Sequence, residues 1–161
     1  AAPGFSARFS AVGREYRYRI VPGPVAPLFL KRYAWWTPKA LDLSAMREAA
    51  EYLVGEHDFK SFCVAGSAVG KRTVRRINTI EITPAHEMGE HSIVVRIVGN
   101  AYLHSMVRIL IGSLVEVGRG KRRPEWMLEI LEARDRAAAG PTAPAEGLTL
   151  WHVDYAEECW L

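Results

Sequence analysis

Residues 103–117 constrain the fold more than any other part of the sequence. Apolar side chains recur there at positions 103, 106, 107, 110, 111, 114 and 115, the spacing of a helix that is apolar over a broad face. A helix of this kind must be covered on several sides, and Gly118 is a typical residue for its end. We therefore expect a broadly buried helix over residues 103–117.

Arg108 lies in the middle of this helix and has no acidic residue within one turn. The nearest downstream carboxylate on the helix is Glu116, eight residues away, which is too far for i,i+4 pairing. Because an unpaired buried guanidinium is costly, its partner must come from another segment, a substrate or another chain. The alternative is an arginine that reaches solvent at the edge of the helix.

The other segments predict a mixture of strands and helices. Residues 14–21 alternate like a half-exposed strand, an extended segment covers residues 28–36, and residues 72–83 and 92–98 form an antiparallel hairpin across the turn 84–91. A helix capped by Asp42 or Ser44 ends near Gly55, a shorter one runs from Pro124 to about Arg134, and residues 148–155 form a last strand. Strands and helices do not alternate regularly, so we expect one α+β domain over residues 1–161, with helices packed on a largely antiparallel sheet.

Composition excludes several classes of protein. The chain has 161 residues, 49% of them hydrophobic, and no apolar run approaches the ~20 residues of a membrane span. Two distant cysteines, Cys63 and Cys159, are typical of reduced thiols in a cytosolic protein, and the five histidines lack metal-ligand spacing. We therefore expect a cytoplasmic protein without a metal site and without a membrane segment.

Two clusters of basic residues lie beside glycines in predicted loops or at their edges. Of the 21 basic residues in the chain 16 are arginine, whose planar fork suits phosphate, although the net charge is only +3. Such loops can follow a phosphate backbone, and the alternative is an ordinary solvated surface. The candidate nucleic-acid-binding residues are Lys71, Arg72, Arg75 and Arg76 in one cluster and Arg122 and Arg123 in the other, beside Arg119 and Lys121.

Tyr16 and Tyr18 share one face of the first predicted strand, with Arg14, Arg17 and Arg19 beside them. Aromatic rings bordered by basic side chains are typical of a surface on which nucleic-acid bases stack. Alternating aromatic residues are equally typical of ordinary core packing in a half-buried strand. The sequence alone leaves both interpretations open.

Seven motifs run through the chain in order: Phe5-Ser-Ala-Arg-Phe-Ser-Ala11, Arg14-Glu-Tyr-Arg-Tyr18, Gly55-Glu-His-Asp-Phe-Lys-Ser-Phe62, Arg72-Thr73, Asn100-Ala-Tyr-Leu-His-Ser-Met-Val-Arg108, Gly112-Ser-Leu-Val-Glu-Val-Gly118 and Ala145-Glu-Gly-Leu148. This ordered, nearly chain-long set resembles the carboxyl-terminal half of the tRNA pseudouridine synthase A family. The resemblance implies the fold of half a pseudouridine synthase catalytic domain. It also implies isomerisation of uridine in the tRNA anticodon arm, with tRNA as partner, no cofactor, and a homodimer.

The resemblance also implies roles for three residues. Arg108 corresponds to the arginine that pairs with the nucleophilic aspartate, Tyr16 to the tyrosine that packs on the target base, and Leu148 to an apolar wall of the pocket. Ile109 departs from the asparagine that the family often has there, which leaves the neighbouring hydrogen bonds open.

The nucleophile itself is missing from the sequence. The family carries it in an Arg-Thr-Asp-Ala-Gly motif, which none of the four aspartates here matches, and the chain begins just after that region. We therefore expect the chain alone to be inactive. Two alternatives to half of an enzyme are a stand-alone, non-catalytic RNA-binding module of the same fold and a structural domain without an RNA role.

Overall fold

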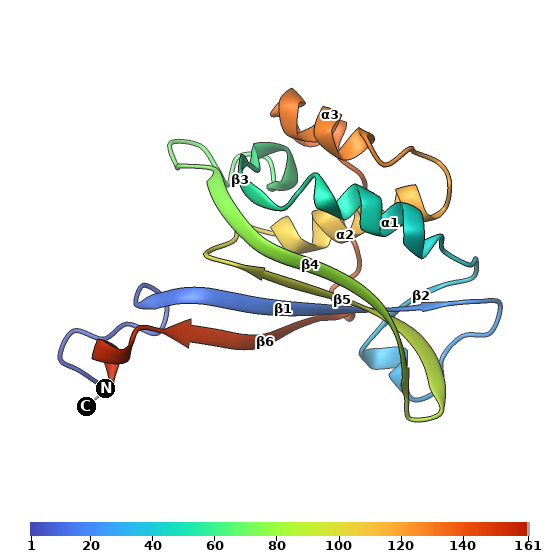
Figure 1. Ribbon diagram of the computed structural model, residues 1–161, viewed down its shortest axis with the longest axis horizontal. Helices are drawn as coiled ribbons and strands as arrows, with labels where there is room; N and C mark the ends of the chain where they lie inside the picture. The colour runs from blue at the N-terminus through green and yellow to red at the C-terminus, as the bar shows by residue number, and fades with distance from the viewer. Residues whose placement is uncertain (161) are drawn as a thin grey trace.

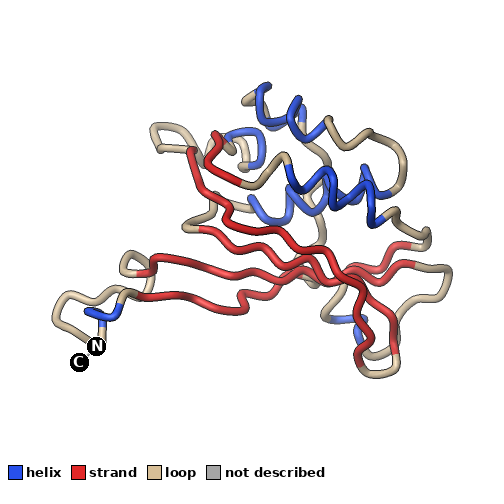
Figure 2. Tube along the Cα trace, viewed as in Figure 1, coloured by secondary structure: helices blue, strands red, loops and turns tan. Residues whose placement is uncertain are grey.

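The computed structural model describes residues 1–160, which form a six-stranded sheet with three α-helices on one of its faces (Figure 1). Figure 2 shows the three α-helices gathered on one side of the strands. The sheet is antiparallel except for one parallel pair, so the predicted α+β class is confirmed. The elements are β1 (Ala11–Pro22), β2 (Trp35–Thr37), α1 (Leu43–Glu51), β3 (Gly55–Asp58), β4 (Val74–Glu87), β5 (Glu90–Gly99), α2 (Met106–Gly118), α3 (Trp126–Ala133) and β6 (Leu148–Tyr155).

Strand β1 organises the sheet, whose order is β2-β1-β5-β4-β3. One edge of β1 pairs with β5, and the other edge pairs with β6 over most of its length and with β2 at its end. The alternation predicted for residues 14–21 is confirmed, because Tyr18 and Ile20 are buried under the helices. The strand predicted over residues 148–155 coincides with β6.

The prediction of one extended segment over residues 28–36 is wrong. Residues Leu30–Arg32 form a 3₁₀ turn, and only Trp35–Thr37 are a strand, parallel to β1. The reason is Glu90, whose carboxylate accepts the backbone N–H groups of Leu28, Phe29 and Leu30 and so curls the chain. The hydrogen bond from Leu30, followed by the other two, lowers the pKa of Glu90 from its ordinary 4.5. Its stabilising effect is complete above the ordinary pKa and is lost as the pH falls through the lowered one.

The central hairpin is longer than its sequence pattern indicates. The turn predicted over residues 84–91 lies only at Met88 and Gly89, which both have positive φ, and β4 and β5 pair up to it. His86 and His91, which the sequence places in the turn, instead stack across the two strands with ring centroids 4.5 Å apart. Cross-strand pairing extends the ladder beyond the apolar residues that marked it in the sequence.

Two helix boundaries also differ from expectation. Asp42 caps α1 as predicted, by accepting the N–H groups of Ser44 and Ala45, but the helix ends at Glu51 instead of near Gly55. The residues that follow form β3, a strand that the sequence pattern missed. The helix predicted to start at Pro124 begins two residues later, at Trp126.

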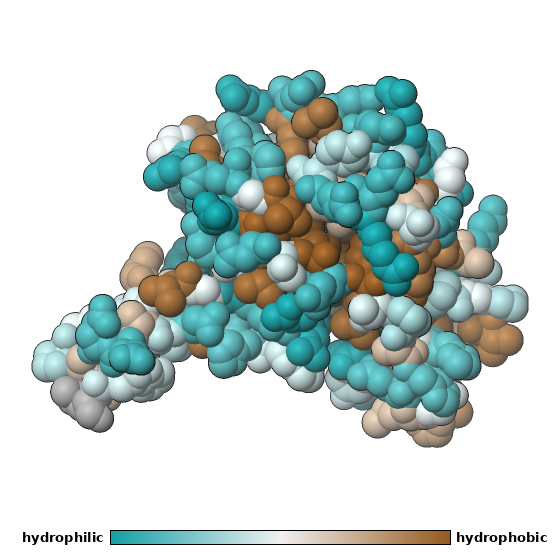
Figure 3. Space-filling model, viewed as in Figure 1, coloured by the Kyte–Doolittle hydropathy of each residue, from teal (hydrophilic) through white to brown (hydrophobic). Residues whose placement is uncertain are grey.

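Helix α2 is the buried centre of the helical layer. It starts at Met106, three residues later than predicted, because Ser105 adopts a left-handed conformation with φ 59°. From there to Gly118 only Arg108 and Glu116 are not buried, so the predicted broadly buried helix is confirmed. The outer surface of the helical layer is mostly hydrophilic, and apolar residues show where helices meet the sheet (Figure 3). Within residues 1–160, no helix has the length and apolar character that a membrane crossing needs.

Candidate functional site

Arg108 is fixed to the loop that leads into β6. Its Nε donates a hydrogen bond to the carbonyl of Ala143 at 2.6 Å, and the N–H of Ala143 donates to the carbonyl of Arg108 at 3.0 Å. Five residues further along α2, Ser113 accepts the N–H of Gly140 at 3.0 Å. The loop over residues 139–147 is therefore tied to α2 by its main chain. The half-buried side chain of Arg108 lies against this loop.

Tyr18 ties the same loop to the sheet. Its hydroxyl donates to the carbonyl of Pro144 at 2.7 Å, next to the carbonyl that Arg108 uses, and the N–H of Arg19 donates to Gly147. Burial raises the pKa of Tyr18, while the nearby charge of Arg108 opposes this rise and that of Glu146 adds to it. For Tyr18 the sequence left base stacking and core packing open, and its full burial shows that it packs in the core. Its alternation with Tyr16 was the signal, but nothing local links it to Pro144, 126 residues away.

Tyr16 and Leu148 lie on the same face of the sheet as Tyr18. Leu148 is the β6 partner of Tyr18, and both Tyr16 and Leu148 are half-buried at the margin of the core. Tyr16 meets Tyr102 edge-on, with ring centroids 5.1 Å apart, and Tyr102 donates to the carbonyls of Arg14 and Ile97. The structure therefore brings the elements of all three predicted site residues to the face that carries the helices. Their roles stay predictions.

No carboxylate pairs with Arg108 among residues 1–160. Glu116, the nearest downstream acid on its helix, is taken by Arg119 at 3.1 Å and by Lys121 at 3.0 Å. The Nη groups of Arg108 thus keep a free donor fork, which suits a carboxylate or a phosphate.

Two of the three arginines beside the tyrosines, Arg17 and Arg19, point to the opposite face of the sheet, whereas Arg14 donates to the carbonyls of Asn100 and Arg8. Arg17 pairs with Glu15 at 2.8 Å and lies over the ring of Trp151, and Arg19 pairs with Glu87 at 2.7 Å. Burial acts to raise the pKa of Glu15, but bonds and charges from Arg17 and Arg96 outweigh it, so the pKa is lowered. These arginines are engaged with acids. Tyr16 and Tyr18 therefore have no border of unpaired charge from Arg17 and Arg19.

The first basic cluster divides between a loop and a strand. Lys71 and Arg72 are exposed in the loop before β4, whereas Arg75 and Arg76 lie within β4 and point to opposite faces. Arg75 is half-buried, and its Nη1 donates to the carbonyls of Arg72 and Val74. Burial, and then the charge of Arg72, lower the pKa of Arg75.

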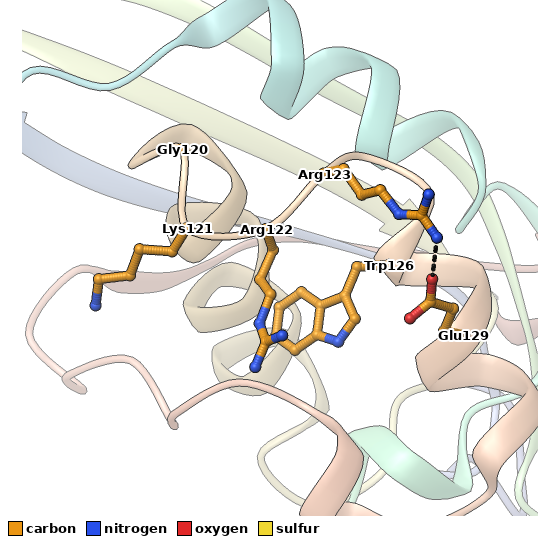
Figure 4. Close-up of a pocket in the computed structure, with 6 residues that line it drawn as sticks. All are labelled: Gly120, Lys121, Arg122, Arg123, Trp126 and Glu129. Atoms are coloured by element: carbon orange, nitrogen blue, oxygen red, sulfur yellow. Dashed lines mark hydrogen bonds and ion pairs between the residues drawn. The ribbon is translucent and has the colours of Figure 1, made fainter.

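The second basic cluster borders a hollow of about 420 Å³ beside α3 (Figure 4). Arg123 pairs with Glu129 at 2.9 Å, whereas the guanidinium of Arg122 lies over the ring of Trp126, 5.0 Å from its centroid. Of the four basic side chains in this cluster, only Arg122 has no acidic partner within the described chain. The two basic clusters lie at opposite ends of the helical layer and do not form one patch (Figure 1).

Comparison with known proteins identifies the family of the chain. A family model described as tRNA pseudouridine synthase matches residues 49–156, more than half of the sequence. The chain belongs to the tRNA pseudouridine synthase family. The matched residues include Arg108, Leu148 and the loop that holds Arg108, while Tyr16 precedes them.

Individual relatives of this tRNA pseudouridine synthase family member support the same assignment. The chain is 45% identical over 155 residues to "tRNA pseudouridine synthase A" of Geobacillus kaustophilus, covering 96% of the chain and 58% of the relative. It is 48% identical over 151 residues to the protein of that name from Brevibacillus brevis, covering 94% and 60%. The Geobacter sulfurreducens protein is 44% identical over 155 residues, covering 96% and 62%. The chain spans about three-fifths of the length of these curated relatives.

Proposed function

We propose that this chain supplies the carboxyl-terminal part of the active site of an enzyme that isomerises uridine in the tRNA anticodon stem-loop to pseudouridine. The observation that carries the proposal is the half-buried Arg108, which the Ala143 carbonyl positions and which has no acidic partner among residues 1–160. A guanidinium so placed can hold an ionised carboxylate in one orientation through charge-assisted hydrogen bonds. The proposal also draws on membership of the family, whose name describes pseudouridine synthesis in tRNA.

The aspartates of the chain are engaged in local structure, so none of them is our candidate nucleophile. Asp42 caps α1, and Asp58 and Asp135 each accept a backbone N–H two residues further along the chain. Asp154 pairs with His152 at 3.0 Å. In our proposal the nucleophilic carboxylate therefore comes from a segment with the Arg-Thr-Asp-Ala-Gly motif, outside these 161 residues.

The proposed reaction assigns one task to each site residue. The target uridine leaves its base stack, and the carboxylate held by Arg108 attacks C1′ and displaces N1 of the base. The freed base turns against Tyr16 and Leu148, and its C5 then attacks C1′ and releases the carboxylate. C5 loses its proton and N1 gains one, so substrate and product have the same composition and the enzyme is regenerated.

The first test compares the 161-residue chain with the longer protein, meaning a protein of the relatives' length that contains these residues. With an anticodon stem-loop tritiated at uridine C5, we expect tritium release from the longer protein and none from the chain alone, which has no matching nucleophile. Adding a separate segment with the Arg-Thr-Asp-Ala-Gly motif to the chain is expected to restore some release. Turnover by the chain alone would refute the assignment of the nucleophile.

We also propose that the protein is a cytoplasmic homodimer. Exposed apolar side chains support self-association: Leu28 is 76% exposed, Phe29 60% and Met88 71%, and all three lie around Glu90 at the end of the central hairpin. An apolar surface of this kind gains free energy when another copy covers it. Two free thiols, Cys63 and Cys159, support a reducing compartment.

Sedimentation equilibrium tests the homodimer. We expect a mass that rises to twice that of the monomer with concentration, and a weaker association in Phe29→Ser, which removes one exposed ring. A monomer at every concentration would argue against the dimer.

A further inference from the structure

A basic hollow of about 770 Å³ lies at the end of the helical layer where α2 begins, apart from Tyr16 and Leu148. Its walls are the 3₁₀ turn Lys60–Phe62, the glycine-containing loop that follows this turn, and the residues directly after α3. The charged side chains that line it are Lys60, Lys71, Arg134, Arg136, Asp58 and Asp135. Sequence reasoning proposed only Lys71 among them as an RNA-binding residue, because the others come from two further segments, residues 58–60 and 134–136.

The two acidic residues of the hollow, Asp58 and Asp135, interact with groups in its own walls. Asp58 accepts the N–H of Lys60 at 3.1 Å, and its other oxygen is 3.6 Å from Nε of Arg134. Asp135 accepts the N–H of Ala137 at 3.0 Å. Neither Lys60 nor Lys71 has an acidic partner in the part of the chain that the structure describes. The hollow thus carries four cations against two acids, with two exposed ammonium groups unpaired.

Hydrogen bonds between distant segments fix the walls of the hollow. Ser61 donates to the carbonyl of Ile130 at 2.6 Å and accepts the N–H of Asp135 at 2.9 Å, which fastens the 3₁₀ turn to the end of α3. The N–H of Val64 donates to the carbonyl of His104, four residues before Arg108. One wall is therefore attached to the chain just ahead of the candidate active site.

We propose that this hollow binds a phosphate of the tRNA backbone next to the nucleotide that Arg108 serves. The inference rests on the proposed function and adds a second contact to it. Lysine ammonium groups act as point charges toward phosphate, and Arg134, with a side chain 67% exposed, adds a fork. A phosphate held here fixes the register of the RNA relative to α2.

The test is the salt dependence of tRNA binding by the longer protein. The triple variant Lys60→Gln, Lys71→Gln, Arg134→Gln is expected to bind more weakly at low salt. Its plot of log affinity against log salt should lose about 0.7 to 0.9 in slope for each phosphate contact removed. The matched control, Lys31→Gln, Arg32→Gln, Lys39→Gln, also removes three positive charges, from exposed positions in the 3₁₀ turn before β2 and just after β2, none of which lines the hollow. We expect the control to keep the parent slope.

The outcomes separate this inference from the proposed function. Equal slopes for parent, triple variant and control refute the hollow as a phosphate site, and so does an equal loss of slope in variant and control. A parent protein that does not bind tRNA refutes the proposed function itself. Lys71→Gln alone, in an exposed loop, repeats the test with one charge should the triple variant have a lowered unfolding temperature.

Discussion

Replacing Arg108 with alanine in the longer protein is expected to lower kcat on the order of 10² to 10³-fold, while the affinity for tRNA changes little. The reason is that the guanidinium, held by the carbonyl of Ala143, orients the attacking carboxylate and does not grip the RNA backbone. Single-turnover tritium release measures the chemical step, and filter binding measures the affinity. Arg108→Lys keeps the charge without the planar fork, so we expect an intermediate loss.

Two controls accompany this prediction. Arg32→Ala removes one charge from an exposed position outside the site and is expected to leave kcat unchanged. Unfolding temperatures of all variants show whether the lost hydrogen bond to Ala143 has disturbed the loop. If Arg108→Ala weakens tRNA binding as much as it slows turnover, Arg108 is a phosphate contact and our mechanism is wrong.

Replacing Gly112 with alanine is expected to destabilise the protein by about 3 kcal/mol or more. A Cβ at this position of α2 falls 1.7 Å from the carbonyl oxygen of Pro141 and 2.9 Å from its carbon. These are main-chain atoms of the loop that Arg108 and Tyr18 hold, so no side-chain rotation relieves the clash. Urea unfolding measures the loss, and we expect it to exceed the benefit of alanine as a helix former.

Gly118→Ala is the matched control on the same helix. Its Cβ meets Sδ of Met46 at 2.6 Å and Cγ at 2.8 Å, both in a flexible side chain that can move aside. Because alanine favours a helix by about 1 kcal/mol over glycine, we expect a net change within about 1 kcal/mol. An equally small change at Gly112 would mean that residues 139–147 give way easily, and so would not support our positioning of Arg108.

Local patterns predicted the elements that local physics decides. The alternation over residues 148–155, the cap at Asp42 and the apolar circumference of α2 each reappear in the structure. The failures have distant causes. Glu90 curls residues 28–30 from about 60 positions away, and β3 is a four-residue polar strand that only its pairing with β4 defines. The spacing of residue types along the sequence does not predict either of these long-range interactions.

In the candidate site, too, the sequence predicted features with local causes and missed those that depend on distant residues. Arg108 was recognisable because its own helix offers no acid, which is visible within a few turns of sequence. Tyr18 was not recognisable as its neighbour, since their link is a pair of adjacent carbonyls in a loop of small residues. The basic hollow likewise depends on Ser61 joining two segments that lie 69 residues apart.

The loop over residues 139–147 has a consequence for how this sequence can change. Surface loops usually accept inserted or deleted residues, because their main chain is bound only at the ends. In this loop Gly140 and Ala143 are hydrogen-bonded to α2, and Pro144 and Gly147 are hydrogen-bonded to β1. The number of residues between these four positions must therefore match the distance from the helix to the sheet. A single added residue shifts either the helix contacts or the sheet contacts out of phase. Its length is thus as tightly specified as that of a strand.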